Sequence, residues 1–195
     1  MTVPAEALYK GLLAPGVALW DVSHLLPLGD KKQRYRDVQG IDTLVVHHSG
    51  RLGRSGFAGL LSSARYMSKV RGFPSAGYTF WIPAETERDE VGNIVVYRCS
   101  PDNERDWHSG SKLNDRGVAV ALQGNTSTQP LTFSHMEGLE ALIPWSWERY
   151  GLAMPDGLCW HSDAKRRGGR SKKACPGKNA EAWLKTYFNA SSFAL

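Results

Sequence analysis

Short apolar runs separated by polar, glycine-rich segments predict a set of β-strands in the middle of the chain. The clearest run is Thr43–His48, which is β-branched, mostly apolar and followed by a Ser-Gly turn, as expected for a buried strand. Three further runs have the same character, namely Gly77–Ile82, Ile94–Arg98 and Gly117–Leu122. The turn-rich polar segment between the first two of these three predicts that they form a hairpin.

A helix is predicted after the first strand. Ser55 is a favourable N-cap residue, and the apolar residues behind it recur at three- and four-residue spacing, which places them on one face of a helix. These residues are Phe57, Leu60, Leu61, Ala64 and Met67. Gly72 and Pro74 are expected to end this helix.

Two further helices are predicted later in the chain. Ser134–Glu137 is a capping-box pattern that opens a helix with an apolar stripe, and Pro144 is expected to kink or divide that helix before Gly151. A last short helix is predicted over about Glu181–Phe188. Because strands and helices are interspersed, the expected fold is α/β, with a mixed central β-sheet flanked by helices.

Length and composition favour one globular domain. The 195 residues contain no internal repeat and no low-complexity linker, so residues 1–195 are expected to form a single domain. The longest apolar stretch, Gly11–Trp20, is broken by Pro15 and is too short to span a membrane. No small-residue cleavage site follows it, so we expect cytoplasmic synthesis without a signal peptide. An odd number of cysteines, three, favours reduced thiols.

The formal net charge of +5 favours an anionic partner. Six basic residues lie between Lys165 and Lys173, and by composition they could form a solvated loop or contact a polyanion. No helix-turn-helix or RNA-binding signature accompanies them, so nucleic acid is not the expected partner.

Histidine and cysteine residues suitable for binding a metal occur at two places. His47 and His48 close the predicted buried strand, whereas His161 and Cys175 lie on either side of the glycine-rich basic loop. Imidazole and thiolate are good zinc ligands, and a catalytic zinc takes three protein ligands with a fourth position left for water. His47, His161 and Cys175 would supply such a set. Cys159 is the alternative fourth ligand, although a buried thiol beside Trp160 is the simpler interpretation.

Six motifs resemble the zinc-dependent N-acetylmuramoyl-L-alanine amidases, a family that includes phage lysozymes of the amidase type and the peptidoglycan recognition proteins. They are VVHHSG (45–50), GYTFWI (77–82), DWHSG (106–110), GVAVALQGN (117–125), WHSDAKR (160–166) and KKACPG (172–177). The resemblance covers about residues 41–177, and the segment 1–40 has no assigned role. It implies the amidase and peptidoglycan recognition protein type of α/β fold.

The resemblance also implies roles for individual residues. The zinc ligands would be His47, His161 and Cys175, and the catalytic residues would be Tyr78 and Lys173. The residues expected to contact substrate are His48, Trp107, His108 and Asn125. The wall-recycling relatives carry a catalytic carboxylate where this chain has Ala121, so the chain is closer to the phage type.

The activity implied by the resemblance is zinc-dependent hydrolysis of the amide between the lactyl group of N-acetylmuramic acid and L-alanine in peptidoglycan. The chain is then expected to be a monomeric phage endolysin that reaches the wall after release, in the host periplasm. The alternative is a protein that binds peptidoglycan without cutting it, as happens in this fold when a zinc ligand is lost. The presence of Cys175 favours the enzyme.

Overall fold

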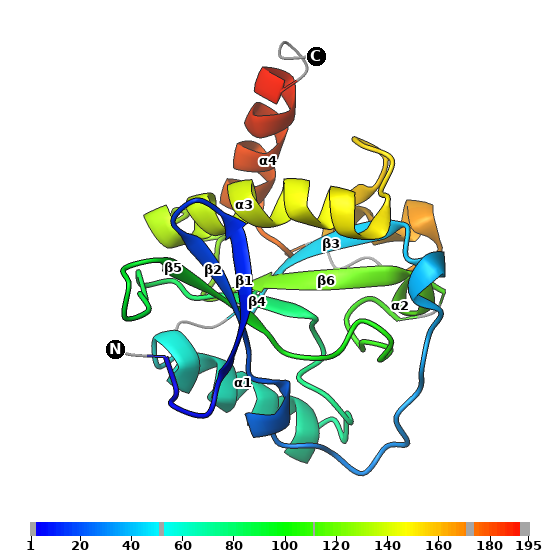
Figure 1. Ribbon diagram of the computed structural model, residues 1–195. Helices are drawn as coiled ribbons and strands as arrows, with labels where there is room; N and C mark the ends of the chain where they lie inside the picture. Colours follow the sequence, from blue (N-terminus) through cyan, green and yellow to red (C-terminus); the bar gives the residue numbers. More distant parts are fainter. Residues whose placement is uncertain (1–2, 51–52, 111, 171–173, 192–195) are drawn as a thin grey trace.

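A mixed seven-stranded sheet forms the centre of the protein, as the computed structural model shows for residues 3–50, 53–110, 112–170 and 174–191 (Figure 1). Its strands lie in the order β1-β2-β5-β4-β6-β3-β7. Their bounds are Leu8–Ala14 (β1), Val17–Asp21 (β2), Thr43–His48 (β3), Phe80–Ile82 (β4), Ile94–Arg98 (β5), Gly117–Leu122 (β6) and Leu158–Trp160 (β7). The predicted α/β class with a mixed central sheet is therefore confirmed.

Four neighbouring strands share one direction. β4 pairs in parallel with β6, β6 with β3, and β3 with β7. The carboxyl ends of these strands consequently meet at one edge of the sheet. The hairpin partner β5 runs antiparallel to β4, as the sequence predicted, and β2 adds to β5 in parallel.

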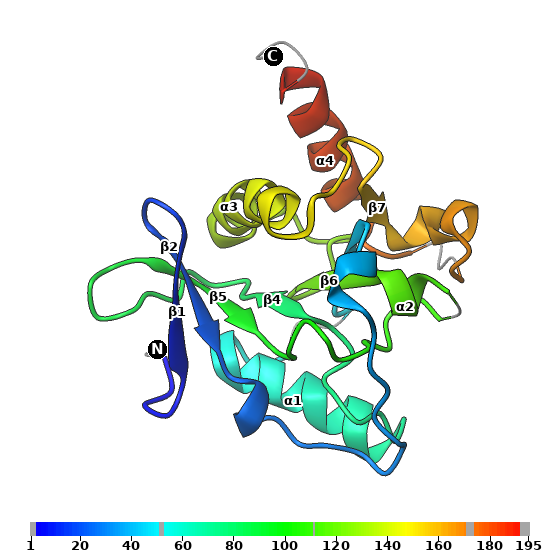
Figure 2. The same ribbon diagram turned by 45° about the vertical axis from the view of Figure 1, so that its right-hand side comes forward.

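Helices cover both faces of the sheet (Figure 2). α1 (Gly56–Lys69) packs on one face, and α3 (Phe133–Tyr150) and α4 (Lys178–Ser191) lie on the other. Side chains of the central strands alternate between these faces: Leu44 and Val46 of β3 join the core under α3 and α4, whereas Val45 faces the opposite way. Strands buried on both faces need apolar residues at every position, which is why these runs were recognisable in the sequence.

Several element boundaries differ from the predicted ones. β4 begins at Phe80 rather than Gly77, because Gly77 has a positive φ of 85° that is incompatible with a regular strand. The helix α4 extends beyond the predicted Glu181–Phe188 at both ends, and the short helix α2 (Leu113–Arg116) was not predicted.

The helix α3 also differs from its prediction. Its N-cap is Thr132, whose hydroxyl accepts from the backbone N–H of His135, so the predicted capping box at Ser134–Glu137 is wrong by two residues. Pro144 does not divide the helix, because it is exposed while the apolar residues around it hold both halves against the same sheet face. Gly151 ends the helix in the left-handed conformation, as expected.

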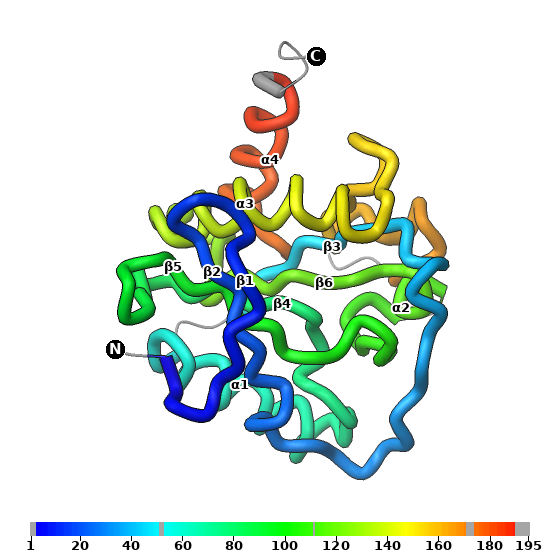
Figure 3. The backbone as a smooth tube through the Cα atoms, in the orientation of Figure 1, coloured from blue at the N-terminus to red at the C-terminus, as the bar shows by residue number. Residues whose placement is uncertain are grey.

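The first forty residues, for which the sequence gives no assignment, contribute two strands to the sheet. The apolar stretch Gly11–Trp20 is a hairpin whose turn lies at Pro15 and Gly16. Beyond β2 the chain passes the C-terminal end of α1 and returns to the start of β3 (Figure 3). It is held there because Gly29 and Lys31 donate backbone hydrogen bonds to Phe73 and Gly72. Among the described residues, no helix is both long and apolar enough to cross a membrane.

The buried His135 is expected to make folding stability depend on pH. Burial lowers its pKa from 6.5 to about 4, so the unfolded chain binds a proton between these values that the folded chain does not. Stability should therefore fall as the pH drops from 7 to 4, by on the order of 3 kcal/mol for this residue. Glutamine is a favourable residue at this capping-box position and does not titrate. In urea unfolding, His135→Gln should thus show a shallower loss of stability with acid; parallel curves for the two proteins would contradict this assignment.

Candidate metal centre and active site

Residues of the candidate site gather where the parallel strands end. His47 is the penultimate residue of β3, and His161 directly follows β7 as the first residue of the 3-10 helix η3 (His161–Arg167). Cys175 lies between η3 and α4. Open α/β sheets bind their ligands outside the carboxyl ends of parallel strands, so this is the edge at which a functional site is expected.

His47, His161 and Cys175 form a buried cluster of three possible metal ligands. One ligand atom from each lies within 4.8 Å of the other two. His47 Nδ1 is 3.6 Å from Cys175 Sγ, and the two imidazole centroids are 4.5 Å apart. All three residues are less than a tenth exposed, at 1%, 8% and 4% respectively. Folding thus brings together the three residues that the sequence analysis selected as ligands.

The donor geometry fits a zinc ion. With Zn–N bonds of about 2.0–2.1 Å and a Zn–S bond of about 2.3 Å, a nitrogen and a sulfur on one tetrahedral ion lie roughly 3.6 Å apart. His47 Nδ1 and Cys175 Sγ have this separation. Three protein ligands leave a fourth position, as in catalytic zinc sites. Cys159 is not in the cluster, since it packs against Val45, Leu113 and Ala164.

His48 supports the cysteine from the backbone side. Its N–H donates to Cys175 Sγ over 3.4 Å, so the sulfur accepts a hydrogen bond from the end of β3. The His48 ring nitrogen Nδ1 lies 3.2 Å from the hydroxyl of Thr126, and that hydroxyl donates to the carbonyl of Pro176. His48 is therefore tied to the turn that carries Cys175, and it also lines the cavity described below.

His108 contacts the other side of His47. Its Nδ1 is 3.0 Å from His47 Nε2 and 2.9 Å from the hydroxyl of Ser109. Burial, together with the positive charge of Arg36, lowers the pKa of His108 to about 3, so its ring is neutral and can accept a hydrogen bond from His47. A proton on Nε2 leaves His47 Nδ1 free to bind a metal. The structure thus gives His108 an orienting contact, while its predicted contact with substrate stays a prediction.

Tyr78 lies beside the cluster. Its ring centroid is 5.3 Å from that of His47, and the residue is 8% exposed. The following residue, Thr79, is held on both sides, because its N–H donates to Ala119 and its carbonyl accepts from Cys99. Burial, followed by the negative charge of Cys175, raises the pKa of Tyr78 well above its usual value. The phenol is therefore protonated at neutral pH and can donate a hydrogen bond.

A cavity of about 700 Å³ opens onto this cluster. All three candidate ligands line it, together with Tyr78 and the predicted substrate residues His48, Trp107 and His108. Trp107 stacks on Phe73 with centroids 5.3 Å apart and an interplanar angle of 24°. The guanidinium carbon of Arg105 lies 4.9 Å from the Trp107 centroid. The cavity wall accordingly combines the candidate metal ligands with a stacked aromatic pair and with two cationic residues, Arg54 and Arg71.

One predicted site residue, Asn125, lies outside this arrangement, and one cannot be placed in it. Asn125 is not among the residues that line the cavity, and its side-chain oxygen accepts from the backbone N–H of Ser127. Lys173 lies outside the residues that the structure describes, so its predicted catalytic role stays a prediction.

One wall of the cavity, formed by α1 and its C-terminal end, was not predicted from the sequence. This wall includes Ser62, Ser63, Tyr66, Met67, Arg71 and Phe73. A spacing of three to four residues places the first four on one side of the helix. This spacing is visible in the sequence, but spacing alone does not distinguish a helix face that lines a cavity from one that is exposed to solvent.

The fold and the site define a class of protein, an α/β protein with a three-residue candidate metal centre at the carboxyl edge of its sheet. Residues 36–178 match the family model described as N-acetylmuramoyl-L-alanine amidase, and the chain belongs to that family. None of the curated proteins compared with the chain matches it. The expected family is therefore confirmed.

Solved structures support this classification at the level of the fold. N-acetylmuramoyl-L-alanine amidase LysC from Clostridium intestinale URNW is 21% identical, with a TM-score of 0.63 over 88% of this chain and 97% of that chain. Drosophila PGRP-LB is 20% identical, with a TM-score of 0.66 over 88% and 94%. Bumblebee PGRP-SA is 19% identical, with a TM-score of 0.65 over 86% and 93%. At these identities the similarity concerns the fold alone.

Proposed function

We propose that the protein is a zinc-dependent amidase that hydrolyses the bond between the lactyl group of N-acetylmuramic acid and L-alanine in peptidoglycan. The observation that carries this proposal is the buried cluster of His47, His161 and Cys175 at one end of a large cavity. Membership of the N-acetylmuramoyl-L-alanine amidase family supports the same activity. The intact ligand set favours catalysis over the alternative, a protein that only binds the wall.

The residues around the cluster have distinct parts in this proposal. A zinc ion in such a site lowers the pKa of water and polarises a carbonyl as a Lewis acid. The protonated phenol of Tyr78 would donate a hydrogen bond to the oxygen that gains negative charge, and Lys173 would supply a positive charge to the same oxygen. His108 would hold His47 in the orientation that presents Nδ1. The stacked Trp107 and Phe73 offer an aromatic surface for the rest of a muramyl peptide.

The biological role that we propose is lysis of a host cell wall by a phage endolysin. One solved neighbour, 21% identical, is an endolysin amidase named LysCS from Clostridium intestinale URNW. The net charge of +5 would favour association with a wall that carries carboxylates and phosphates, and salt would weaken this association.

The bond that is cut can be tested directly by mass spectrometry of purified peptidoglycan after digestion. An amidase should release stem peptides with a free L-alanine amino group and leave glycan strands with free lactyl carboxylates. New reducing ends would instead indicate a glycosidase, and cuts within the stem would indicate an endopeptidase; either product pattern would overturn the proposal. Binding to the wall without any released product would favour the non-catalytic alternative.

A further inference from the structure

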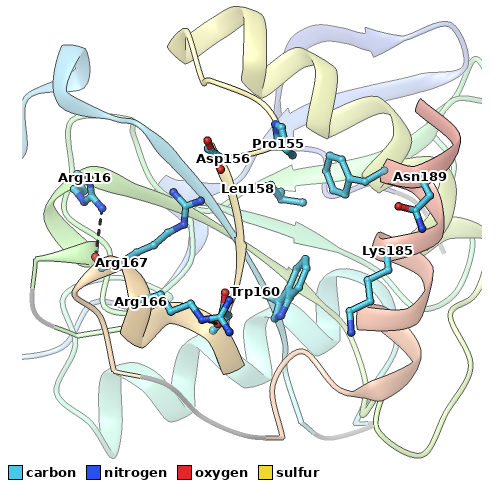
Figure 4. A pocket seen from close by; sticks show the side chains of 11 residues that line it. Arg116, Pro155, Asp156, Leu158, Trp160, Arg166, Arg167, Lys185 and Asn189 are labelled. Carbon is cyan, nitrogen blue, oxygen red and sulfur yellow. Dashed lines mark hydrogen bonds and ion pairs between the residues drawn. The ribbon is translucent and has the colours of Figure 1, made fainter. Parts of the chain in front are cut away.

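A second cavity lies on the opposite side of β7 from the candidate metal centre. It has a volume of about 780 Å³ and is bordered by β7, η3 and α4 (Figure 4). The residues that line it are Arg116, Pro155, Asp156, Leu158, Trp160, Asp163, Arg166, Arg167, Lys185, Phe188 and Asn189. None of them lines the cavity at the metal centre. We call this second cavity the α4 pocket.

The end of β7 separates the two cavities. Trp160 is the last residue of β7 and lines the α4 pocket, whereas the next residue, His161, lines the cavity at the metal centre. A hydrogen bond connects the two helices that border the α4 pocket: the hydroxyl of Ser162 in η3 donates to the carboxylate of Glu181 in α4. The α4 pocket is therefore a site of its own, formed by well-packed elements.

The positive charge of the α4 pocket is only partly neutralised within the protein. Arg116 pairs with Asp42, and Arg166 Nε lies 2.9 Å from Asp163 Oδ1. For Arg167 and Lys185, the part of the chain that the structure describes provides no ion pair. Arg116 also donates to the carbonyl of Arg167 over 3.3 Å, which fixes the backbone at that residue. Two cations thus remain available to an anionic ligand.

Aromatic and hydrogen-bonding groups lie among these cations. Trp160 and Phe188 are half-buried, and in the view of Figure 4 Trp160 lies between Arg167 and Lys185. An aromatic face flanked by hydrogen-bonding groups suits the apolar face of a sugar ring, since the ring presents C–H groups to the aromatic face and hydroxyls to its surroundings. Asp156 supplies carboxylate oxygens that can accept from such hydroxyls.

We propose that the α4 pocket binds an acidic carbohydrate polymer, with a sugar ring or a polyol chain against Trp160 and a phosphate or carboxylate bound by Arg167 and Lys185. Single-stranded DNA fits less well, because Asp156 and Asp163 favour a ligand with free hydroxyl donors, which the phosphodiester backbone of DNA lacks. Two wall polymers have the required chemistry. One is a polymer of sugars or polyols linked by phosphate, and the other is a glycan strand with free lactyl carboxylates. The second source rests on the proposed function, because it is a product of that reaction.

Calorimetric titration with defined probes can test this site. The probes are a peptide-free tetrasaccharide of N-acetylglucosamine and N-acetylmuramic acid, a glycerol phosphate oligomer, neutral chitotetraose and a short single-stranded oligonucleotide. One of the first two should bind at low salt, with chitotetraose at least about tenfold weaker, because charge-assisted hydrogen bonds would be missing. Whichever of these two acidic probes binds shows which of the two wall polymers is the ligand. The tetrasaccharide has no stem peptide, so hydrolysis cannot consume it.

Matched variants locate the binding. The double variant Arg167→Gln and Lys185→Gln should weaken binding by about tenfold or more, since two charge-assisted contacts are lost. Arg65→Gln with Lys69→Gln removes the same charge from exposed positions of α1 and should change binding less than about twofold. The single variant Lys185→Glu, at an exposed position, provides the same test with less risk to folding. Turnover of a soluble muropeptide should be unchanged in all of these variants.

Several results would overturn the proposal. The first is that the wild-type protein binds neither acidic probe. The second is that the α1 control weakens binding as much as the pocket variants do. The third is that the oligonucleotide binds more tightly than both acidic probes, with the same dependence on Arg167 and Lys185. Failure of the proposed function gives a different result. In that case muropeptide turnover is absent from the wild-type protein, while binding of the glycerol phosphate oligomer that depends on Lys185 would still support the pocket.

Discussion

Replacing Cys175 with serine should remove zinc binding and wall lysis together. The Cys175 Sγ lies 3.6 Å from His47 Nδ1 and Cys175 is only 4% exposed, and a serine hydroxyl at this position would remain protonated and bind zinc poorly. Loss of a group that merely orients a ligand typically costs about 10–100-fold in metal affinity or activity, so loss of a ligand should cost more than roughly 100-fold. Metal analysis of the purified variant, beside turbidity loss of isolated walls, measures both effects.

Two matched controls separate ligand loss from general damage. Cys99→Ser changes a buried thiol that is not in the metal-ligand cluster, and it should retain both zinc and lysis. His47→Ala should lose zinc, whereas His48→Ala should retain it, because only His47 belongs to the cluster. Full zinc content and full lysis in Cys175→Ser would show that the cluster is not the metal centre. Lysis at the original rate by wild-type protein from which a chelator has removed the metal would lead to the same conclusion.

Tyr78→Phe should reduce turnover by roughly 100-fold while zinc content stays at the wild-type level. The substitution keeps the ring that packs 5.3 Å from His47 and removes only the hydroxyl, which the raised pKa keeps protonated. Removing a single hydrogen-bond donor to a developing oxyanion typically costs about 10²–10³-fold in kcat. Single-turnover rates on a soluble muropeptide, with zinc measured on the same sample, test this expectation.

Tyr66→Phe is the corresponding control. Tyr66 also lines the cavity, but it is 43% exposed and lies on α1, so loss of its hydroxyl should change turnover by less than a few-fold. Equal losses in the two variants would reduce Tyr78 to an ordinary cavity residue. A fall in zinc content in Tyr78→Phe would instead show that its role is to maintain the metal site.

Local pattern in the sequence was sufficient for the elements that are buried on both sides. β3 and β6 have the predicted bounds, and α1 begins after the predicted cap and ends before Gly72. In these elements the periodicity of apolar residues is imposed by the core itself, so sequence and structure agree. The strands β1, β2 and β7 were not predicted. β1 is exposed or half-buried along its whole length and β7 has three residues, so neither has the apolar run of a strand that is buried on both faces.

The sequence also determined which side chains could bind a metal, since only a few residue types have the required donors. What it could not determine is the direction in which each side chain points. His47 and His48 are adjacent, and successive residues of a strand face opposite sides of the sheet, yet only the packed structure shows that His47 meets His161 and Cys175 while His48 contacts Thr126. The orienting contact of His108 likewise depends on two residues 61 positions apart in the chain.

Both cavities were decided by tertiary structure alone. One side of α1 lines the first, and the α4 pocket joins residues of β7 and η3 to residues of α4 that lie outside the WHSDAKR motif. A local pattern records whether a residue is apolar and how often that recurs, and this determines the secondary structure and the buried faces. The shape of a cavity depends on how separate elements approach one another, and that arrangement is set by long-range packing of the whole core.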